Sequence, residues 1–142
     1  MRLFLKLGCG SAALLLVTGI LGAVSLPLFL DFEVDRRVEV QQIVEELARL
    51  EEDYYSWNST YLEVRNPFPR PRHAVNDQSA MFGWDNGDVS MLGFYPDDDE
   101  MYGVYWVDSD GSTFTVNGLI EVEGEIQHWT ATSSSPDATQ VF

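Results

Sequence analysis

Hydrophobic positions divide the chain into segments with different periods. Residues 7–30 hold no charged side chain, and this run exceeds the ~20 residues with which a helix crosses a bilayer. Over residues 31–57 apolar side chains recur at steps of three and four, with Glu, Gln and Arg between them, which predicts an amphipathic helix. Because no Gly or Pro interrupts residues 31–57, we expect one long helix, a membrane half followed by an amphipathic half. Its apolar stripe comprises Val40, Ile43, Val44, Leu47, Leu50 and Tyr54.

Charges on either side of the apolar run predict its orientation. Arg2 and Lys6 precede it and Asp31 follows, so the positive-inside rule places the N-terminus in the cytoplasm and the rest of the chain outside. A cleaved signal peptide is the alternative, but its apolar core has only ~7–15 residues and ends at a small-residue site that this run lacks. The predicted divisions are a basic leader 1–6, a transmembrane half 7–30, an amphipathic half 31–57 and an extracellular head 58–142.

Beyond residue 58 the pattern becomes extended. The stretch RNPFPRPRH is read as a loop because its prolines forbid a helix. Four runs rich in aromatic and β-branched residues then predict strands at 89–95, 102–107, 113–122 and 125–132. Their short connections favour an antiparallel meander. We therefore expect an α+β fold, with the long N-terminal helix packed on a four-stranded antiparallel sheet and residues 133–142 frayed. The layer between them is expected to contain Phe94, Val104, Trp106, Phe114, Val116, Ile126 and Trp129.

The amino-acid composition limits the surroundings and partners that suit this protein. The net charge is −15, from 23 acids and 8 bases, and residues 73–142 contain thirteen acids without any Lys or Arg. Such a surface repels nucleic acid and anionic headgroups and suits an extracellular face, a cationic partner or a salty medium. The single cysteine, Cys9, excludes an internal disulfide.

The apolar run has an internal weak point. Within a helix, Pro27 removes one hydrogen bond and clashes with the carbonyl of Ala23, at a cost of ~3 kcal/mol. Gly19 and Gly22 each reduce helix preference by ~1 kcal/mol. This segment is expected to kink or to unwind, and the alternative is an ordinary kinked membrane helix, since such helices are common and often contain Gly.

These features resemble a known family, the type IV pilins and pseudopilins. The resemblance is carried by GILGAVSLPLFLDF, by the amphipathic stretch after it and by DYYSWNSTYLEV. The later runs LGFYP and MYGVYWV are similar to the sheet half of the short, disulfide-free pilins. The positions that match the family's N-terminal pattern are Gly19, Pro27, Phe29, Phe32, Tyr54, Tyr55, Asn58, Thr60 and Tyr61.

The resemblance implies a structural subunit that waits in the membrane. Assembly machinery then extracts it into a filament whose core holds the apolar half-helices and whose heads face outward. In many members the segment around the proline melts on assembly. Adhesion, motility, secretion and DNA uptake remain open as uses, and DNA has the least support because of the charge. Partners are then the membrane, other copies or other pilin-like subunits, with no nucleic acid expected.

The N-terminus departs from the family pattern. Family precursors have a leader ending in Gly, a methylated first residue and a glutamate four residues later. Gly8, Cys9 and Gly10 are the processing candidates here, and no glutamate follows any of them at the required place. The chain is then either a minor, tip-type subunit or an unprocessed membrane protein. The alternative function is a non-assembling single-pass protein with an acidic extracellular binding or sensor domain.

Other motifs carry little chemistry. The arginines Arg65, Arg70 and Arg72 either pair with acids of their own domain or contact the acidic sheet of an adjacent subunit. The sequence DSDGS at 108–112 resembles the start of a calcium loop, but its glycine comes too early, so a hairpin turn is the better interpretation. No nucleophile elbow, phosphate loop or paired-carboxylate motif is present. We expect no enzyme activity, no cofactor and no metal.

Overall fold

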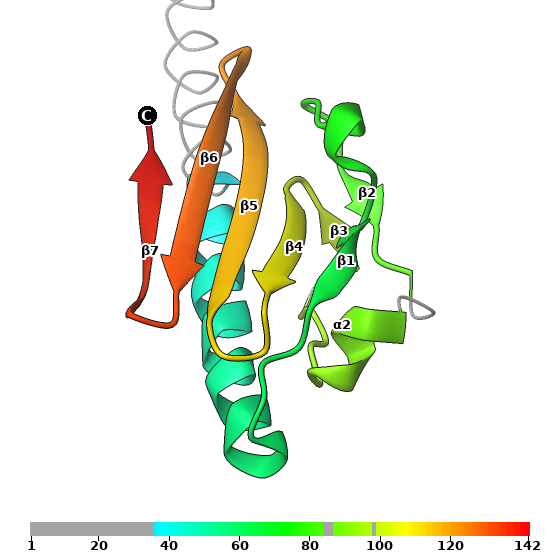
Figure 1. Cartoon of the computed structure of the whole chain (residues 1–142). Coiled ribbons are helices and arrows are strands. Elements are labelled where there is room, and N and C mark those ends of the chain that lie inside the picture. The colour runs from blue at the N-terminus through cyan, green and yellow to red at the C-terminus, as the bar shows by residue number, and fades with distance from the viewer. Residues whose placement is uncertain (1–35, 84–86, 98) are drawn as a thin grey trace, which may run out of the picture. The chain divides into compact units, whose positions relative to one another are not determined.

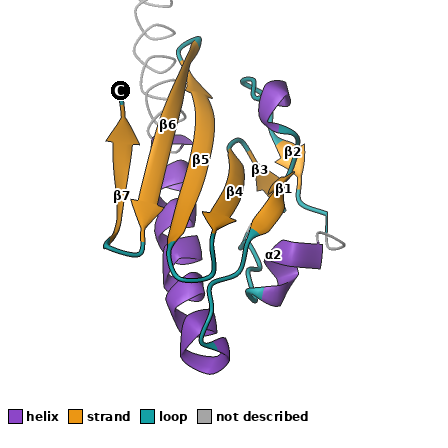
Figure 2. Ribbon diagram, in the orientation of Figure 1, coloured by secondary structure: helices purple, strands orange, loops and turns teal. Residues whose placement is uncertain are grey.

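The computed structural model describes residues 36–83, 87–97 and 99–142. Helix 36–58 covers one face of a five-stranded antiparallel sheet with the order β1-β4-β5-β6-β7, and β2 and β3 form a separate two-stranded sheet (Figures 1 and 2). In Figure 1 the helix lies behind β5 and β6, and β7 forms one edge of the larger sheet. The remaining elements are β1 Val64–Phe68, η1 Arg72–Ala74, β2 Ala80–Met81, α2 Gly87–Met91, β3 Glu100–Met101, β4 Val104–Ser109, β5 Phe114–Val122, β6 Glu125–Thr132 and β7 Ser135–Val141.

The prediction of a long N-terminal helix on a four-stranded sheet was wrong. The described helix covers residues 36–58, and the predicted membrane half at 7–30 lies outside the described residues. Within the described part of the chain, no helix has the length and apolar character needed to cross a bilayer. The larger sheet has five strands because β1 and β7 add to its two edges.

The two edge strands, β1 and β7, form in segments for which the sequence predicts a loop and a frayed end. Pro67 lies in β1, where an edge position tolerates a residue that cannot donate a ladder hydrogen bond. Residues 135–141, expected to fray, pair with β6 as β7. Each edge strand has an irregular register against its neighbour, β1 between Val64 and Phe68 and β6–β7 between Thr130 and Thr132. These shifts break the regular alternation that sequence patterns detect.

The first predicted strand, 89–95, was also wrong. Its beginning belongs to the short helix α2, in which Ser90 Oγ donates a hydrogen bond to the carbonyl of Gly87 at 2.9 Å. Val89 and Leu92, three residues apart, are both buried. A short apolar run fits the helical and the extended period equally well, so its contacts with other segments decide whether it forms a helix or a strand.

The second predicted strand, 102–107, is confirmed only from Val104 onward, as part of β4, because residues 102 and 103 form the turn between β3 and β4. Glu39, from the helix, accepts hydrogen bonds at one carboxylate oxygen from the backbone N–H groups of Tyr102 and Gly103, at 2.9 and 3.0 Å. The hydroxyl of Tyr105 donates to the same oxygen at 2.9 Å. A carboxylate on a distant element therefore holds the turn between the two strands. The last two predicted strands are confirmed as β5 and β6.

The core lies between the helix and the larger sheet. Val40, Val44 and Leu47 are fully buried, and the other stripe residues, Ile43, Leu50 and Tyr54, pack partly buried against the same cluster, so the predicted stripe is confirmed. Phe94, Phe114 and Val116 also join this core, and Trp129 packs against it.

Three predicted core positions do not join this layer. Val104 and Trp106 are buried outside the main core cluster, on the opposite face of β4, and Ile126 is 60% exposed. The reason is that β4 begins with four apolar residues in succession, so its sequence has no alternation to identify the inner face. In the structure, Tyr105 and Val107 are the β4 residues that join the main core.

Candidate functional site

The aromatic motif lies where the helix ends. The rings of Tyr55 and Tyr61 stack at 4.4 Å, and Tyr61 meets Phe114 edge-on at 4.8 Å. Asn58 Nδ2 donates to the carbonyl of Tyr54 at 3.0 Å, and Ser59 has a positive φ of 55°, which reverses the chain. The predicted motif residues therefore act together, as a junction between the helix and the sheet.

The same junction binds the turn between β4 and β5. The backbone N–H of Tyr61 and the hydroxyl of Thr60 donate to the carbonyl of Gly111, at 3.0 and 3.2 Å. Within that turn, Asp110 Oδ1 accepts hydrogen bonds from the backbone N–H groups of Thr113 and Ser112, which lower the pKa of Asp110 to about 2. The prediction of a hairpin turn at 108–112 is confirmed.

A buried carboxylate, Glu51, lies beside this junction and was missed from sequence. Its Oε2 accepts a hydrogen bond from the backbone N–H of Leu62 at 2.9 Å, whereas Oε1 is buried without a hydrogen-bond partner. Burial raises the pKa of Glu51 to about 7, the Leu62 N–H opposes this rise, and the charge of Glu52 adds to it. The sequence does contain a sign that Glu51 is buried, because position 51 continues the apolar stripe four residues after Leu47.

A second group of side chains, the Arg72 cluster, lies on the face of the sheet opposite the helix. The guanidinium of Arg72 lies 3.8 Å from the centre of the Trp106 ring, which in turn stacks on His128 at 6.1 Å. Asp108 Oδ2 accepts from Trp106 Nε1 at 2.9 Å and from Asn117 Nδ2 at 3.0 Å. The cluster consists of Arg72, Trp106, Asp108, Asn117 and His128.

The cluster depresses the basicity of its histidine. Burial lowers the pKa of His128, and the positive charge of Arg72 lowers it further. His128 Nε2 lies 3.0 Å from Asn117 Oδ1, within hydrogen-bond distance. Since Asn117 also donates to Asp108, the polar groups form one connected network across β4, β5 and β6.

We expect Arg72→Gln to raise the pKa of His128 and to destabilise the domain by about 1 kcal/mol. The substitution removes the positive charge that opposes protonation of the imidazole and the cation–π contact with Trp106. An NMR titration of the His128 ring and a chemical unfolding curve measure the two effects. Arg65→Gln, which removes an arginine in contact with Glu63, is the matched control and leaves the His128 titration unchanged.

The three arginines of the predicted basic island have separate roles. Arg65 pairs with Glu63 at 2.6 Å, and Arg72 belongs to the cluster just described. Arg70 donates to the carbonyls of Gln78 and Tyr102 and so joins the loop after β1 to β3. Arg72 also lies 3.9 Å from Asp108 Oδ1, so Arg65 and Arg72 both pair with acids of their own domain, as the first alternative predicts. Contact with an adjacent subunit stays a prediction.

The contacts that hold both sites together are hydrogen bonds, ring stacking and a cation–π contact. Among the described residues, no group of three His, Cys, Asp or Glu side chains is placed to hold a metal ion. Six predicted site residues lie outside the described ranges, namely Gly8, Cys9, Gly10, Gly19, Gly22 and Pro27. No family model, curated protein or solved structure matches this chain.

Proposed function

We propose that this chain is a pilin-like structural subunit, anchored in the membrane through residues 7–30 and assembled with further subunits into a surface filament. The observation that carries the proposal is the order of its parts. An uncharged segment of membrane length is followed, after only residues 31–35, by a helix whose apolar stripe is buried against an antiparallel sheet. So short a spacer keeps the folded domain at the surface of the membrane.

The aromatic junction supports the same proposal. It joins the end of helix 36–58 to the sheet through the Tyr55–Tyr61 stack and through two hydrogen bonds to Gly111. A force applied along the helix is thereby transmitted to the sheet through several contacts in parallel. Such a connection suits a subunit that is pulled from a membrane into a filament.

The distribution of charge supports assembly with other protein subunits over binding to nucleic acid. The acid-rich second half disfavours nucleic acid and anionic lipid surfaces. Like-charged subunits assemble when the repulsion is screened by salt or when cationic groups meet the acidic face. Arg72 offers such a group, because its side chain is 49% exposed even though it lies 3.9 Å from Asp108 Oδ1.

A second candidate is a membrane-tethered domain that never polymerises and instead binds a ligand outside the cell. One observation favours it, a pocket between the helix and the strands β6 and β7. This function and the first share the anchor and the orientation. They differ in whether the N-terminus is processed and whether the protein leaves the membrane.

Mass spectrometry of the protein isolated from cells tests the proposal. We expect a trimmed N-terminus that carries a methyl group, close to Gly8, Cys9 or Gly10, and we expect the protein in the sheared surface fraction. An intact Met1 together with full retention in the membrane fraction would contradict assembly and favour the tethered domain. Chains carrying Gly8→Ala, Cys9→Ala or Gly10→Ala identify the processing site, because only the change at that site should block trimming.

A further inference from the structure

The end of helix 36–58 carries a modification motif that the proposed function does not use. Residues Asn58, Ser59 and Thr60 form the sequence N-x-[ST], with x other than proline, which is the acceptor motif for N-linked glycans. The chain has five asparagines, and only Asn58 has Ser or Thr two positions later. Because a motif this short also arises by chance, the surroundings of Asn58 decide whether it can be modified.

The motif is accessible to solvent. Asn58, Ser59 and Thr60 are all exposed, and they lie in the bend between the helix and the chain that leads to β1. Ser59 has a φ of 55°, and its backbone N–H donates to the carbonyl of Tyr55 at 2.8 Å, so the chain leaves the helix at the residue after the acceptor. A modification at this bend displaces no part of the core.

The amide of Asn58 can carry a sugar and keep its present hydrogen bond. Nδ2 donates to the carbonyl of Tyr54 at 3.0 Å in an exposed hydrogen bond. A primary amide has two N–H groups, and attachment of a glycan replaces only one of them. The other N–H still donates to Tyr54, so a glycan at Asn58 is compatible with the end of the helix as the structure has it.

The residue before the acceptor is an indole that the protein leaves uncovered. Trp57 is 87% exposed, whereas Trp106 is 5% exposed. The aromatic junction stacks Tyr55 on Tyr61 and leaves Trp57 in solvent. One face of a pyranose ring consists of C–H groups, and stacking that face on an indole removes apolar surface of both from water. A glycan that begins at the neighbouring residue has its first sugar within reach of this ring.

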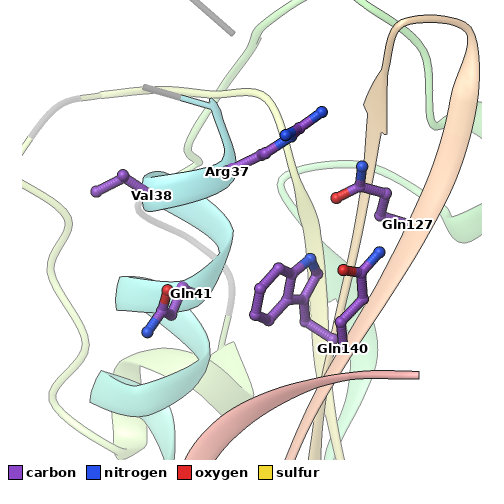
Figure 3. A pocket seen from close by; sticks show the side chains of 6 residues that line it. Arg37, Val38, Gln41, Gln127 and Gln140 are labelled. Carbon is purple, nitrogen blue, oxygen red and sulfur yellow. The ribbon is translucent and has the colours of Figure 1, made fainter. Parts of the chain in front are cut away.

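The place of the motif in the chain suits transfer at a membrane. In the proposed orientation the chain after the uncharged segment 7–30 lies outside the cell. Residues 31–58 span up to ~100 Å when extended, so Asn58 of a newly translocated, unfolded chain can reach an enzyme in the same membrane. In the folded domain Asn58 lies ~30 Å along the helix from Arg37, which lines the pocket shown in Figure 3, so the first sugar leaves that pocket open.

We propose that Asn58 is the acceptor of an N-linked glycan whose first sugar covers Trp57. The donor class is an oligosaccharide joined through C1 to a polyprenyl phosphate or diphosphate, and the enzyme class is a membrane oligosaccharyltransferase. Asn58 Nδ2 forms a bond to C1, the bond from C1 to the phosphate oxygen breaks, and the amide proton leaves with the lipid phosphate. The inference rests on the orientation given under the proposed function, which the tethered alternative shares.

Mass spectrometry of the protein isolated from its own cells tests the proposal. Trypsin cuts after Arg49 and Arg65, so the motif lies in the single peptide 50–65. We expect this peptide to carry the added mass of a glycan and fragmentation to place that mass on Asn58. A peptide found only without added mass overturns the proposal, as does a glycan attached through a hydroxyl of the same peptide.

The N-terminal peptide of the same digest separates this proposal from filament assembly. A trimmed, methylated N-terminus together with an unmodified Asn58 would overturn glycosylation and leave assembly standing. A glycan on Asn58 together with an intact Met1 and full retention in the membrane would support glycosylation and contradict assembly.

Substitutions in the motif provide matched controls. Asn58→Gln and Thr60→Ala should abolish the added mass, whereas Thr60→Ser, which keeps the hydroxyl, should retain it. Asn66→Gln should also retain it, because Asn66 is exposed but is followed by Pro67 and Phe68 instead of the motif. A glycan that persists on peptide 50–65 in Asn58→Gln or Thr60→Ala overturns the proposal.

Fluorescence quenching tests the contact with Trp57. Enzymatic removal of the glycan should raise the quenching of tryptophan fluorescence by acrylamide, because the indole returns to its exposure of 87%. Trp57→Phe is the control, which should carry the same glycan and show no change in quenching when the glycan is removed. Equal quenching of the parent before and after removal overturns the contact.

Discussion

Raising the pH from about 4.5 to about 7 is expected to lower the free energy of unfolding by about 2–3 kcal/mol through Glu51 alone. Burial raises the pKa of this carboxyl from 4.5 to about 7 in the folded state. Between these values the folded state keeps a proton that the unfolded state releases. The stability contributed by the protonated carboxyl is therefore complete below pH 4.5 and is lost as the pH approaches 7.

The structural reason is the unequal environment of the two carboxyl oxygens. Oε2 has the backbone N–H of Leu62 as a donor, whereas Oε1 is buried with no partner. Ionisation places negative charge on an oxygen that neither water nor the protein solvates. One hydrogen bond from a peptide N–H is insufficient compensation, because burial is the larger effect on the pKa.

Chemical unfolding of the full chain in detergent, repeated from pH 4 to pH 8, measures this dependence. Glu51→Gln removes the ionisation but keeps an acceptor for Leu62, so the variant should exceed the parent by about 3 kcal/mol at pH 8 and match it near pH 4. Glu46→Gln changes an exposed acid on the same helix and serves as the control for the overall charge. Equal pH profiles for the parent and Glu51→Gln would show that Glu51 does not cause the dependence.

Gly118→Ala is expected to destabilise the domain by about 3 kcal/mol. A Cβ at Gly118 would lie 2.7 Å from Val44 Cγ2 and 2.8 Å from Val40 Cγ2, distances shorter than real Cβ contacts. Both valines are fully buried and β-branched, so neither side chain can turn aside easily. The added methyl group therefore has to displace the helix from β5.

Urea unfolding monitored by tryptophan fluorescence measures the loss. Gly87→Ala is the matched control, because no atom lies within 4 Å of a Cβ at that position, and it should change stability by less than about 0.5 kcal/mol. Val44→Ala makes room for the new methyl group, so the double variant should lose about 1–2 kcal/mol less than the sum of the two single losses. Strict additivity would mean that the helix does not pack against Gly118 as the structure has it.

Sequence and structure agree for those features that are determined by contacts between residues close together in the chain. The helical stripe and the strands β5 and β6 have strong periods of their own, and both were predicted to within a residue or two where the structure describes them. The turn at 108–112 was predicted because Asp110 bonds to backbone groups only two and three residues away. In each case the determining interaction is local or repeats along one element.

The remaining features depend on partners far along the chain. The inner face of β4 is selected by the helix, since its own apolar run has no period, and the turn at Tyr102 and Gly103 is held by Glu39. The candidate pocket joins Arg37 to residues of β6 and β7. The sequence by itself therefore determined the elements with a regular pattern, the acidic surface and the apolar segment at 7–30. Only the tertiary structure decided the edge strands, the buried Glu51 and the pocket, because each requires the free energy of contacts between segments that no local pattern connects.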